Sequence, residues 1–114
     1  MSGRVVALTS DLIFSSKIAA AGVAAGAQLT VVRSLSALQA HLSESPRLLL
    51  VVLDLADVDP IAAITLARGR PQPPRIVAFG SHVETEKLTL ARAVGADEVL
   101  ARSAFVNKLD ALLA

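Results

Sequence analysis

Leu48-Leu49-Leu50-Val51-Val52-Leu53-Asp54 is an uninterrupted apolar run that leads directly to one carboxylate, and it decides the fold. Such a run is typical of a strand buried on both faces of a parallel sheet, because a half-exposed antiparallel strand alternates apolar and polar residues. In open parallel sheets, ligands bind where the carboxyl ends of the strands emerge. We therefore expect Asp54 to lie at a functional edge of a parallel sheet.

Four other segments have the composition of strands, and a helical pattern follows every strand. The expected strands are residues 4–8, 29–33, 48–53, 75–79 and 98–101. Alternation of this kind, with right-handed crossovers, predicts a parallel sheet between two layers of helices. For five strands we expect the order 2-1-3-4-5, which gives an α/β, three-layer, flavodoxin-like (βα)5 fold.

Helix starts are marked by residues that can cap a helix. Asp11 or Ser10 is expected to cap the first helix, and Asp59-Pro60 reads as an N-cap followed by proline at the first helical position. The remaining expected starts are two capping boxes, Ser36 with Gln39 and Ser81 with Glu84, and a cap at Ser103 for the last helix.

Composition narrows the class of protein. The chain has 114 residues, of which 54% are hydrophobic and 18% charged, so we expect one globular domain over residues 1–114. A net charge of +1 favours neither nucleic acid nor a membrane surface as a partner. The sequence has no cysteine, which excludes disulfides and thiol catalysis, and no signal-peptide pattern. A cytoplasmic location is expected.

Three segments together carry a family resemblance. They are 50–55 (Leu-Val-Val-Leu-Asp-Leu), 74–81 (Pro-Arg-Ile-Val-Ala-Phe-Gly-Ser) and 95–102 (Gly-Ala-Asp-Glu-Val-Leu-Ala-Arg). They resemble the receiver domains of bacterial two-component response regulators, and the resemblance covers nearly the whole chain. The last segment is the most specific, since it is similar to the family's Gly-Ala-Asp-Asp-Tyr-Leu-x-Lys. The resemblance implies that Asp54 occupies the phospho-accepting position.

The other receiver-site equivalents depart from the family pattern. They are Thr9, Ser10, Asp11, Gly80, Ser81 and Arg102. Receivers carry an acidic pair after the first strand, which holds Mg²⁺ through oxygen ligands, and Thr9 and Ser10 stand there instead. Arg102 stands where the family has a lysine, and its guanidinium has the same positive charge but is planar rather than compact. This pattern predicts a pseudo-receiver in which Asp54 is either solvated or paired with Arg102.

The predicted function is protein–protein contact in bacterial signalling or regulation, without enzymatic turnover and without a cofactor or metal. One alternative is a working receiver phosphorylated on Asp54 with the help of Asp11 and Arg102, and this alternative alone calls for Mg²⁺. A second alternative is a module for a small anionic ligand or nucleotide, because the hydroxyl-rich loop 9–16 leads into a helix N-terminus. That loop lacks the glycines that let a backbone close around phosphate.

The resemblance also implies an interaction face, since receivers commonly act through the fourth helix, fifth strand and fifth helix. The corresponding residues are Lys87, Arg92, Asp97, Val106, Lys108, Asp110 and Leu113. Val106 and Leu113 fall away from the side of the last helix that carries Phe105, Leu109 and Leu112. We expect them to leave apolar area exposed for a protein partner, or for a second copy in a homodimer.

Overall fold

The computed structural model describes residues 4–54, 57–83 and 85–114, in which five strands alternate with five helices. Their order is β1 (Val5–Leu8), α1 (Leu12–Ala25), β2 (Leu29–Val32), α2 (Leu35–Leu42), β3 (Leu48–Val52), α3 (Pro60–Arg68), β4 (Arg75–Gly80), α4 (Thr85–Ala93), β5 (Glu98–Ala101) and α5 (Arg102–Leu113). The strands form one parallel sheet in the order β2-β1-β3-β4-β5, which confirms the predicted flavodoxin-like topology.

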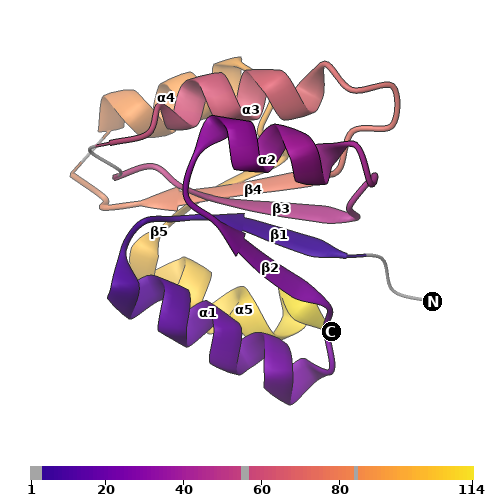
Figure 1. Cartoon of the computed structure of the whole chain (residues 1–114). Coiled ribbons are helices and arrows are strands. Elements are labelled where there is room, and N and C mark those ends of the chain that lie inside the picture. Colours follow the sequence, from indigo (N-terminus) through magenta and orange to yellow (C-terminus); the bar gives the residue numbers. More distant parts are fainter. Residues whose placement is uncertain (1–3, 55–56, 84) are drawn as a thin grey trace.

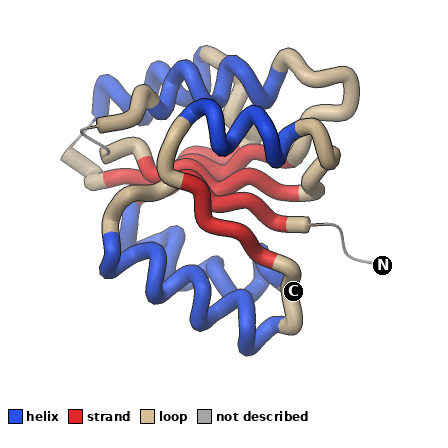
Figure 2. Tube along the Cα trace, in the orientation of Figure 1, coloured by secondary structure: helices blue, strands red, loops and turns tan. Residues whose placement is uncertain are grey.

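The helices lie in two layers, one on each side of the sheet. Helices α2, α3 and α4 cover one face, and α1 and α5 cover the other (Figure 1), so the sheet is the middle of three layers (Figure 2). Strand β3 lies at the centre, and all five of its residues are buried. Among the described helices, none is both long enough and apolar enough to cross a bilayer.

Three aromatic rings fill the core between the sheet and the layer of α1 and α5. The rings of Phe79 and Phe105 stack with centroids 3.6 Å apart, and Phe14 lies 5.3 Å from Phe79 in a tilted arrangement. Because these residues come from α1, β4 and α5, the aromatic cluster joins three segments that are distant in the sequence. Phe79 is the penultimate residue of β4 and pairs with Val52, so the cluster lies near the carboxyl edge of the sheet, where Asp54 follows β3.

Two of the predicted caps are confirmed. The Asp11 carboxylate accepts hydrogen bonds from the backbone N–H groups of Ile13 and Phe14. The Asp59 carboxylate accepts those of Ile61 and Ala62, with Pro60 at the first helical position. These bonds satisfy donors that the first turn of a helix otherwise leaves unpaired.

Two other expected helix starts are wrong, and a third cannot be compared. Helix α2 begins at Leu35, because Ser34 rather than Ser36 accepts the N–H of Ala37. Strand β5 runs into α5 without a loop, so the N-cap is Ala101 and Ser103 lies inside the first turn. Glu84, the second member of the expected box with Ser81, lies outside the described residues.

The predicted exposure of Leu113 is also wrong. Helix α5 buries Phe105, Leu109 and Leu113 at steps of four residues, and Leu112 is only partly buried. The Arg47 guanidinium donates to the carbonyls of Leu112 and Leu113, at 3.4 and 3.2 Å, and holds the end of the helix against the body of the domain. Leu113 is therefore part of the core and not of an exposed face.

Glu98 is the first residue of β5, at the amino-terminal edge of the sheet, and it lies between two cations. Its carboxylate accepts hydrogen bonds from Arg75 at 2.5 Å and from Lys108 at 2.8 Å. The Lys108 bond, followed by the Arg75 bond, holds the pKa of Glu98 below its ordinary value of 4.5. Both cationic side chains are more than half exposed, so solvent weakens the contribution to stability.

Replacing Glu98 with glutamine should make stability less dependent on pH. Because the folded pKa is lowered, the stabilisation by Glu98 is complete above the unfolded pKa and is lost as the pH falls through the folded pKa. Glu98→Gln should therefore lower the urea midpoint at neutral pH, and the difference from the wild type should shrink well below pH 4.5. Asp110→Asn, a change of an exposed carboxylate on α5, is the control. An equal loss at both pH values would contradict the expectation.

Candidate functional site

Asp54 follows β3 at the carboxyl edge of the sheet, as the sequence predicted. Its Oδ2 atom accepts the backbone N–H of Ser81 at 3.0 Å and the Arg102 guanidinium at 2.6 Å. The Asp54 side chain is 19% exposed and that of Arg102 is 45% exposed. The carboxylate is therefore paired with Arg102 rather than simply solvated, and it joins the exit of β3 to the exit of β4 and the start of α5.

The second oxygen of Asp54 is closed off from solvent. Its Oδ1 atom is buried and has no hydrogen-bond partner. The carboxylate lies against Gly80, where an added Cβ would come within 2.9 Å of Oδ1 and 3.1 Å of the Leu53 Cβ. Neither oxygen of Asp54 is therefore open in this conformation, since Oδ1 is covered and Oδ2 is already bonded twice.

Arg102 is held from two sides. Its guanidinium carbon lies 4.8 Å from the centroid of the Phe14 ring, in cation–π range, while one terminal nitrogen bonds Asp54. The Phe14 ring is itself fixed by the aromatic cluster with Phe79. Arg102 therefore has a defined position, although it is the first residue of a helix at the surface.

No protein-family model matches the sequence, and no curated protein does. The structure, however, is similar to solved response regulators. One is the signal receiver domain of a response regulator from Bermanella marisrubri, with a TM-score of 0.80, 19% identity and coverage of 100% of both chains. The chain has the receiver-domain fold.

Two further structures show the same likeness. A response regulator protein from Burkholderia pseudomallei, solved with a phosphorylated aspartic acid, calcium ion and citrate, has a TM-score of 0.80 and 21% identity over 99% of this chain and 67% of that one. NtrX from Brucella abortus has a TM-score of 0.81 and 18% identity over 98% of this chain. The present chain spans only 26% of the length of NtrX. At such low identity, the likeness concerns the fold.

The three polar residues that follow β1 are engaged in hydrogen bonds within the chain. Thr9 is buried, and its hydroxyl accepts the N–H of Asp11 at 3.0 Å. Ser10 donates to Asp57 at 2.9 Å, and Asp11 uses one oxygen to cap α1. Within the described residues, no three side chains among His, Asp and Glu come together. Mg²⁺ takes six oxygen ligands in near-octahedral geometry, of which one or two are commonly carboxylates and several are waters. Of Thr9, Ser10 and Asp11, only Asp11 has a carboxylate, and one of its oxygens caps α1.

The residues of the predicted interaction face differ in how they are engaged. Lys108 is engaged with Glu98, and Asp97 accepts the backbone N–H of Ile76 and lies 3.5 Å from Arg68. Its remaining charged members are Lys87, Arg92 and Asp110, none of which forms an ion pair within the described residues. Val106 is partly buried, and Leu113 belongs to the core. The face is polar and carries charges of both signs.

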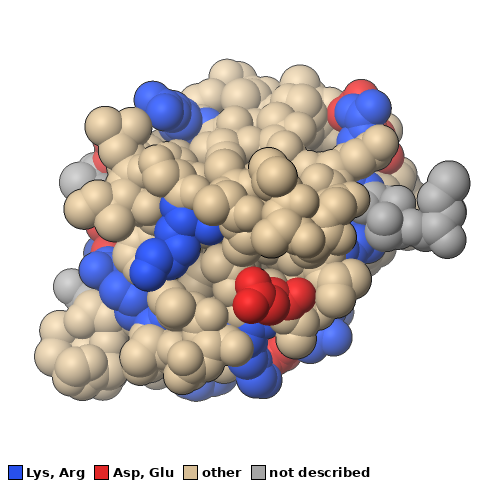
Figure 3. Space-filling model, turned by 90° about the horizontal axis from the view of Figure 1, so that it is seen from below, with Lys and Arg blue, Asp and Glu red and all other residues tan. Residues whose placement is uncertain are grey.

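Exposed large apolar side chains lie on α1 and also at Val83 and Leu90, before and on α4. Leu12, Ile13 and Val23 are 66%, 78% and 82% exposed. On the side of the molecule that α1 and α5 cover, charged residues of both signs cross the middle of the view and uncharged residues make up most of the rest (Figure 3). A helix after the first strand was predicted from the sequence, but its exposed apolar side chains were not. The available signal was composition, since Lys17 is the only charged residue in this helix.

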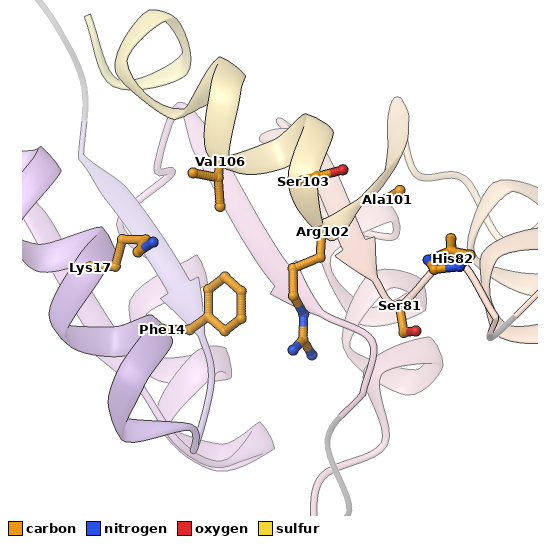
Figure 4. A pocket seen from close by; sticks show the side chains of 8 residues that line it. All are labelled: Phe14, Lys17, Ser81, His82, Ala101, Arg102, Ser103 and Val106. Atoms are coloured by element: carbon orange, nitrogen blue, oxygen red, sulfur yellow. The ribbon is translucent and has the colours of Figure 1, made fainter.

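A second feature missed from the sequence is a pocket of about 530 Å³ beside the pair of Asp54 and Arg102. It lies between the starts of α1 and α5 and the exit of β4 (Figure 4). No local motif marks it, because its walls come from residues up to 92 positions apart, from Phe14 to Val106.

The ion pair between Asp54 and Arg102 should contribute measurably to folding. In a double-mutant cycle of Asp54→Asn and Arg102→Gln, we expect a coupling free energy of about 1 kcal/mol, because the carboxylate is mostly shielded from solvent. Urea unfolding of the four proteins gives this value. The control is the exposed pair of Arg4 and Glu44, 2.9 Å apart, for which the coupling should be close to zero. Equal coupling in both cycles would show that the contact at Asp54 has no special weight.

Proposed function

We propose that this domain is a pseudo-receiver, which acts in the cytoplasm of a bacterium as a protein–protein interaction module in signalling or regulation, without enzymatic turnover. The observation that carries the proposal is the Arg102 guanidinium, 2.6 Å from Oδ2 of Asp54. A side-chain cation occupies the carboxylate at the acceptor position, in a receiver fold where Thr9 and Ser10 stand in place of an acidic pair.

Phosphorylation of a carboxylate requires an oxygen that can attack and a cation that neutralises the incoming phosphoryl group. In Asp54, Oδ1 is buried against Gly80, and Oδ2 is bonded to Ser81 and Arg102. Attack through Oδ2 would first require Arg102 to leave both Asp54 and the Phe14 ring. Without a metal to take over the charge, this step makes phosphorylation of Asp54 inefficient.

The same contact gives the domain a constant shape for a partner. Because Asp54, Ser81 and Arg102 follow or begin β3, β4 and α5, one carboxylate sets how these three elements meet. The surface of α4, β5 and α5 is then defined without any modification. We propose that a protein partner, or a second copy of the chain, contacts this surface. Arg92 and Asp110 are exposed there.

A working receiver is the second candidate, and one observation favours it. The backbone N–H of Ser81 already donates to Asp54, which places a hydrogen-bond donor beside the acceptor carboxylate. This candidate requires Arg102 to move away and Asp11 to supply a metal ligand while it caps α1. The two candidates differ in their response to Mg²⁺ and to a phosphoryl mimic.

An amide NMR titration with Mg²⁺ and then beryllofluoride should leave Asp54, Ser81 and Arg102 unshifted, because neither the metal nor the mimic finds its ligands. The double variant Ser10→Asp, Arg102→Lys is the positive control. It adds an acid beside Asp11 and removes the guanidinium fork, so it should gain a saturable response to Mg²⁺. Saturable shifts in the wild type at millimolar Mg²⁺, abolished by Asp54→Asn, would establish a phosphorylation switch instead.

Sedimentation velocity over a range of concentrations tests self-association through α4, β5 and α5. We expect a reversible dimer that is weakened by Arg92→Glu, because this change reverses an exposed charge on α4. Arg33→Glu is the matched control, since Arg33 is exposed beyond β2 at the opposite edge of the sheet. A monomer at every concentration would reject the homodimer and leave another protein as the partner.

A further inference from the structure

The pocket beside Arg102 has the size of a ligand site. Its volume of about 530 Å³ falls within the range of roughly 300 to 1,000 Å³ that small-molecule pockets occupy. Figure 4 shows Phe14, Lys17 and Val106 on one side of the pocket, Ser81 and His82 on the other, and Arg102 between them. Its walls therefore combine apolar, hydroxyl and cationic groups.

The charge of the pocket is positive. Lys17 and Arg102 line it together with His82, and no aspartate or glutamate is among its described lining residues. Arg102 is shared with Asp54, but Lys17 forms no ion pair in the part of the chain that the structure describes. It is also the only charge on an otherwise uncharged helix. A cation placed in this way favours an anionic ligand.

Phe14 and Val106 form the apolar part of the pocket, and Phe14 is 7% exposed. The Phe14 ring is fixed by Phe79, and Val106 extends the apolar wall from α5. The guanidinium of Arg102 lies 4.8 Å from the Phe14 centroid, so a charged group held by Arg102 would lie close to an apolar surface. A ligand that fits both features has an aromatic or similarly flat body and one acidic group.

The N-terminus of α5 also favours an anionic ligand in the pocket. This helix has twelve residues, and its N-cap, Ala101, provides no side-chain hydrogen bond to the first turn. Ala101 and Ser103 line the pocket, so the uncapped turn lies at its wall. The first turn of a helix carries partial positive charge and unpaired N–H groups, which adds to the charges of Lys17 and Arg102.

We propose that this pocket binds a small organic anion, with its apolar body against Phe14 and Val106 and its acidic group near Lys17 and Arg102. The inference goes beyond contact with a protein partner, because it gives the domain a chemical input. A bound anion competes with Asp54 for the guanidinium of Arg102. Binding is thus expected to change the environment of the Ser81 amide, which donates to the same carboxylate oxygen.

The test uses two anionic probes and two controls in amide NMR titrations of the whole chain. The probes are 2-naphthoate and 2-naphthyl phosphate, which separate carboxylate from phosphate as the acidic group. The controls are 2-naphthylmethanol, which lacks the charge, and inorganic phosphate, which lacks the apolar body. We expect saturable shifts at Phe14, Ser81 and Arg102 with at least one probe, and binding at least about tenfold weaker for both controls.

Two variants locate the site without disturbing the fold. Ser103→Asp adds an acid to the pocket, and it should not destabilise α5, because an acid in the first turn of a helix is favourable. Lys17→Gln removes an exposed charge on α1. Each should raise the dissociation constant of the preferred probe, by about threefold to tenfold. Asn107→Asp on the same helix and Lys87→Gln on α4 are the matched controls, and neither residue lines the pocket.

Three results would overturn the inference: no saturable shift with either probe, equal binding of the neutral analogue, or no effect of Ser103→Asp and Lys17→Gln. These outcomes are independent of the proposed pseudo-receiver function. A response to beryllofluoride would reject that function and leave the anion site standing. Failure of both probes to bind would reject the anion site and would not affect the evidence for the ion pair between Asp54 and Arg102.

Discussion

The contact between the Asp54 carboxylate and the Arg102 guanidinium organises the carboxyl edge of this domain. It brings together the ends of β3 and β4, the start of α5 and the Phe14 ring of α1. Such a contact also has a cost, because Oδ1 of Asp54 is buried without a partner. A partly shielded ion pair with one unpaired oxygen is weak evidence for stability as such. Its clearer effect is to fix one arrangement of these elements.

A carboxylate that is paired with a side-chain cation differs chemically from one that is paired with a dissociable metal ion. A metal comes and goes with its concentration, keeps water ligands and can accept a phosphoryl oxygen in its coordination shell. The guanidinium of Arg102 is part of the chain, so it is present at every metal concentration, and one of its terminal nitrogens is bonded to Asp54. The same fold can therefore respond to a metal-dependent modification or hold a constant surface, depending on a few side chains at one edge of the sheet.

Sequence reasoning succeeded where the physics is local or topological. The run 48–53 predicted the central strand because burial on both faces leaves an uninterrupted apolar segment. Pairing of Asp54 with Arg102, 48 residues apart, was one of two predicted alternatives, and it was foreseeable because strand ends share one edge of a parallel sheet. Sequence reasoning failed for the adjacent residues Leu112 and Leu113, because only packing decides which of two neighbouring leucines faces the core. The exposed apolar side chains of α1 were missed because Lys17 is the only charged residue of that helix, so charge does not mark its solvent side. The pocket was missed because no motif spans walls that come from distant segments.

Gly80 has a consequence for how this domain can change over evolution. A single added methyl group there would meet the buried oxygen of Asp54 at 2.9 Å, and the carboxylate would have to turn away from β4. The burial of Oδ1 of Asp54 thus depends on the lack of a side chain at Gly80, a residue with no reactive group of its own. A substitution of Gly80 can change how accessible the Asp54 carboxylate is while every polar group of the site is retained. Descendants of this sequence could therefore gain or lose an accessible carboxylate without any change in their acids or bases.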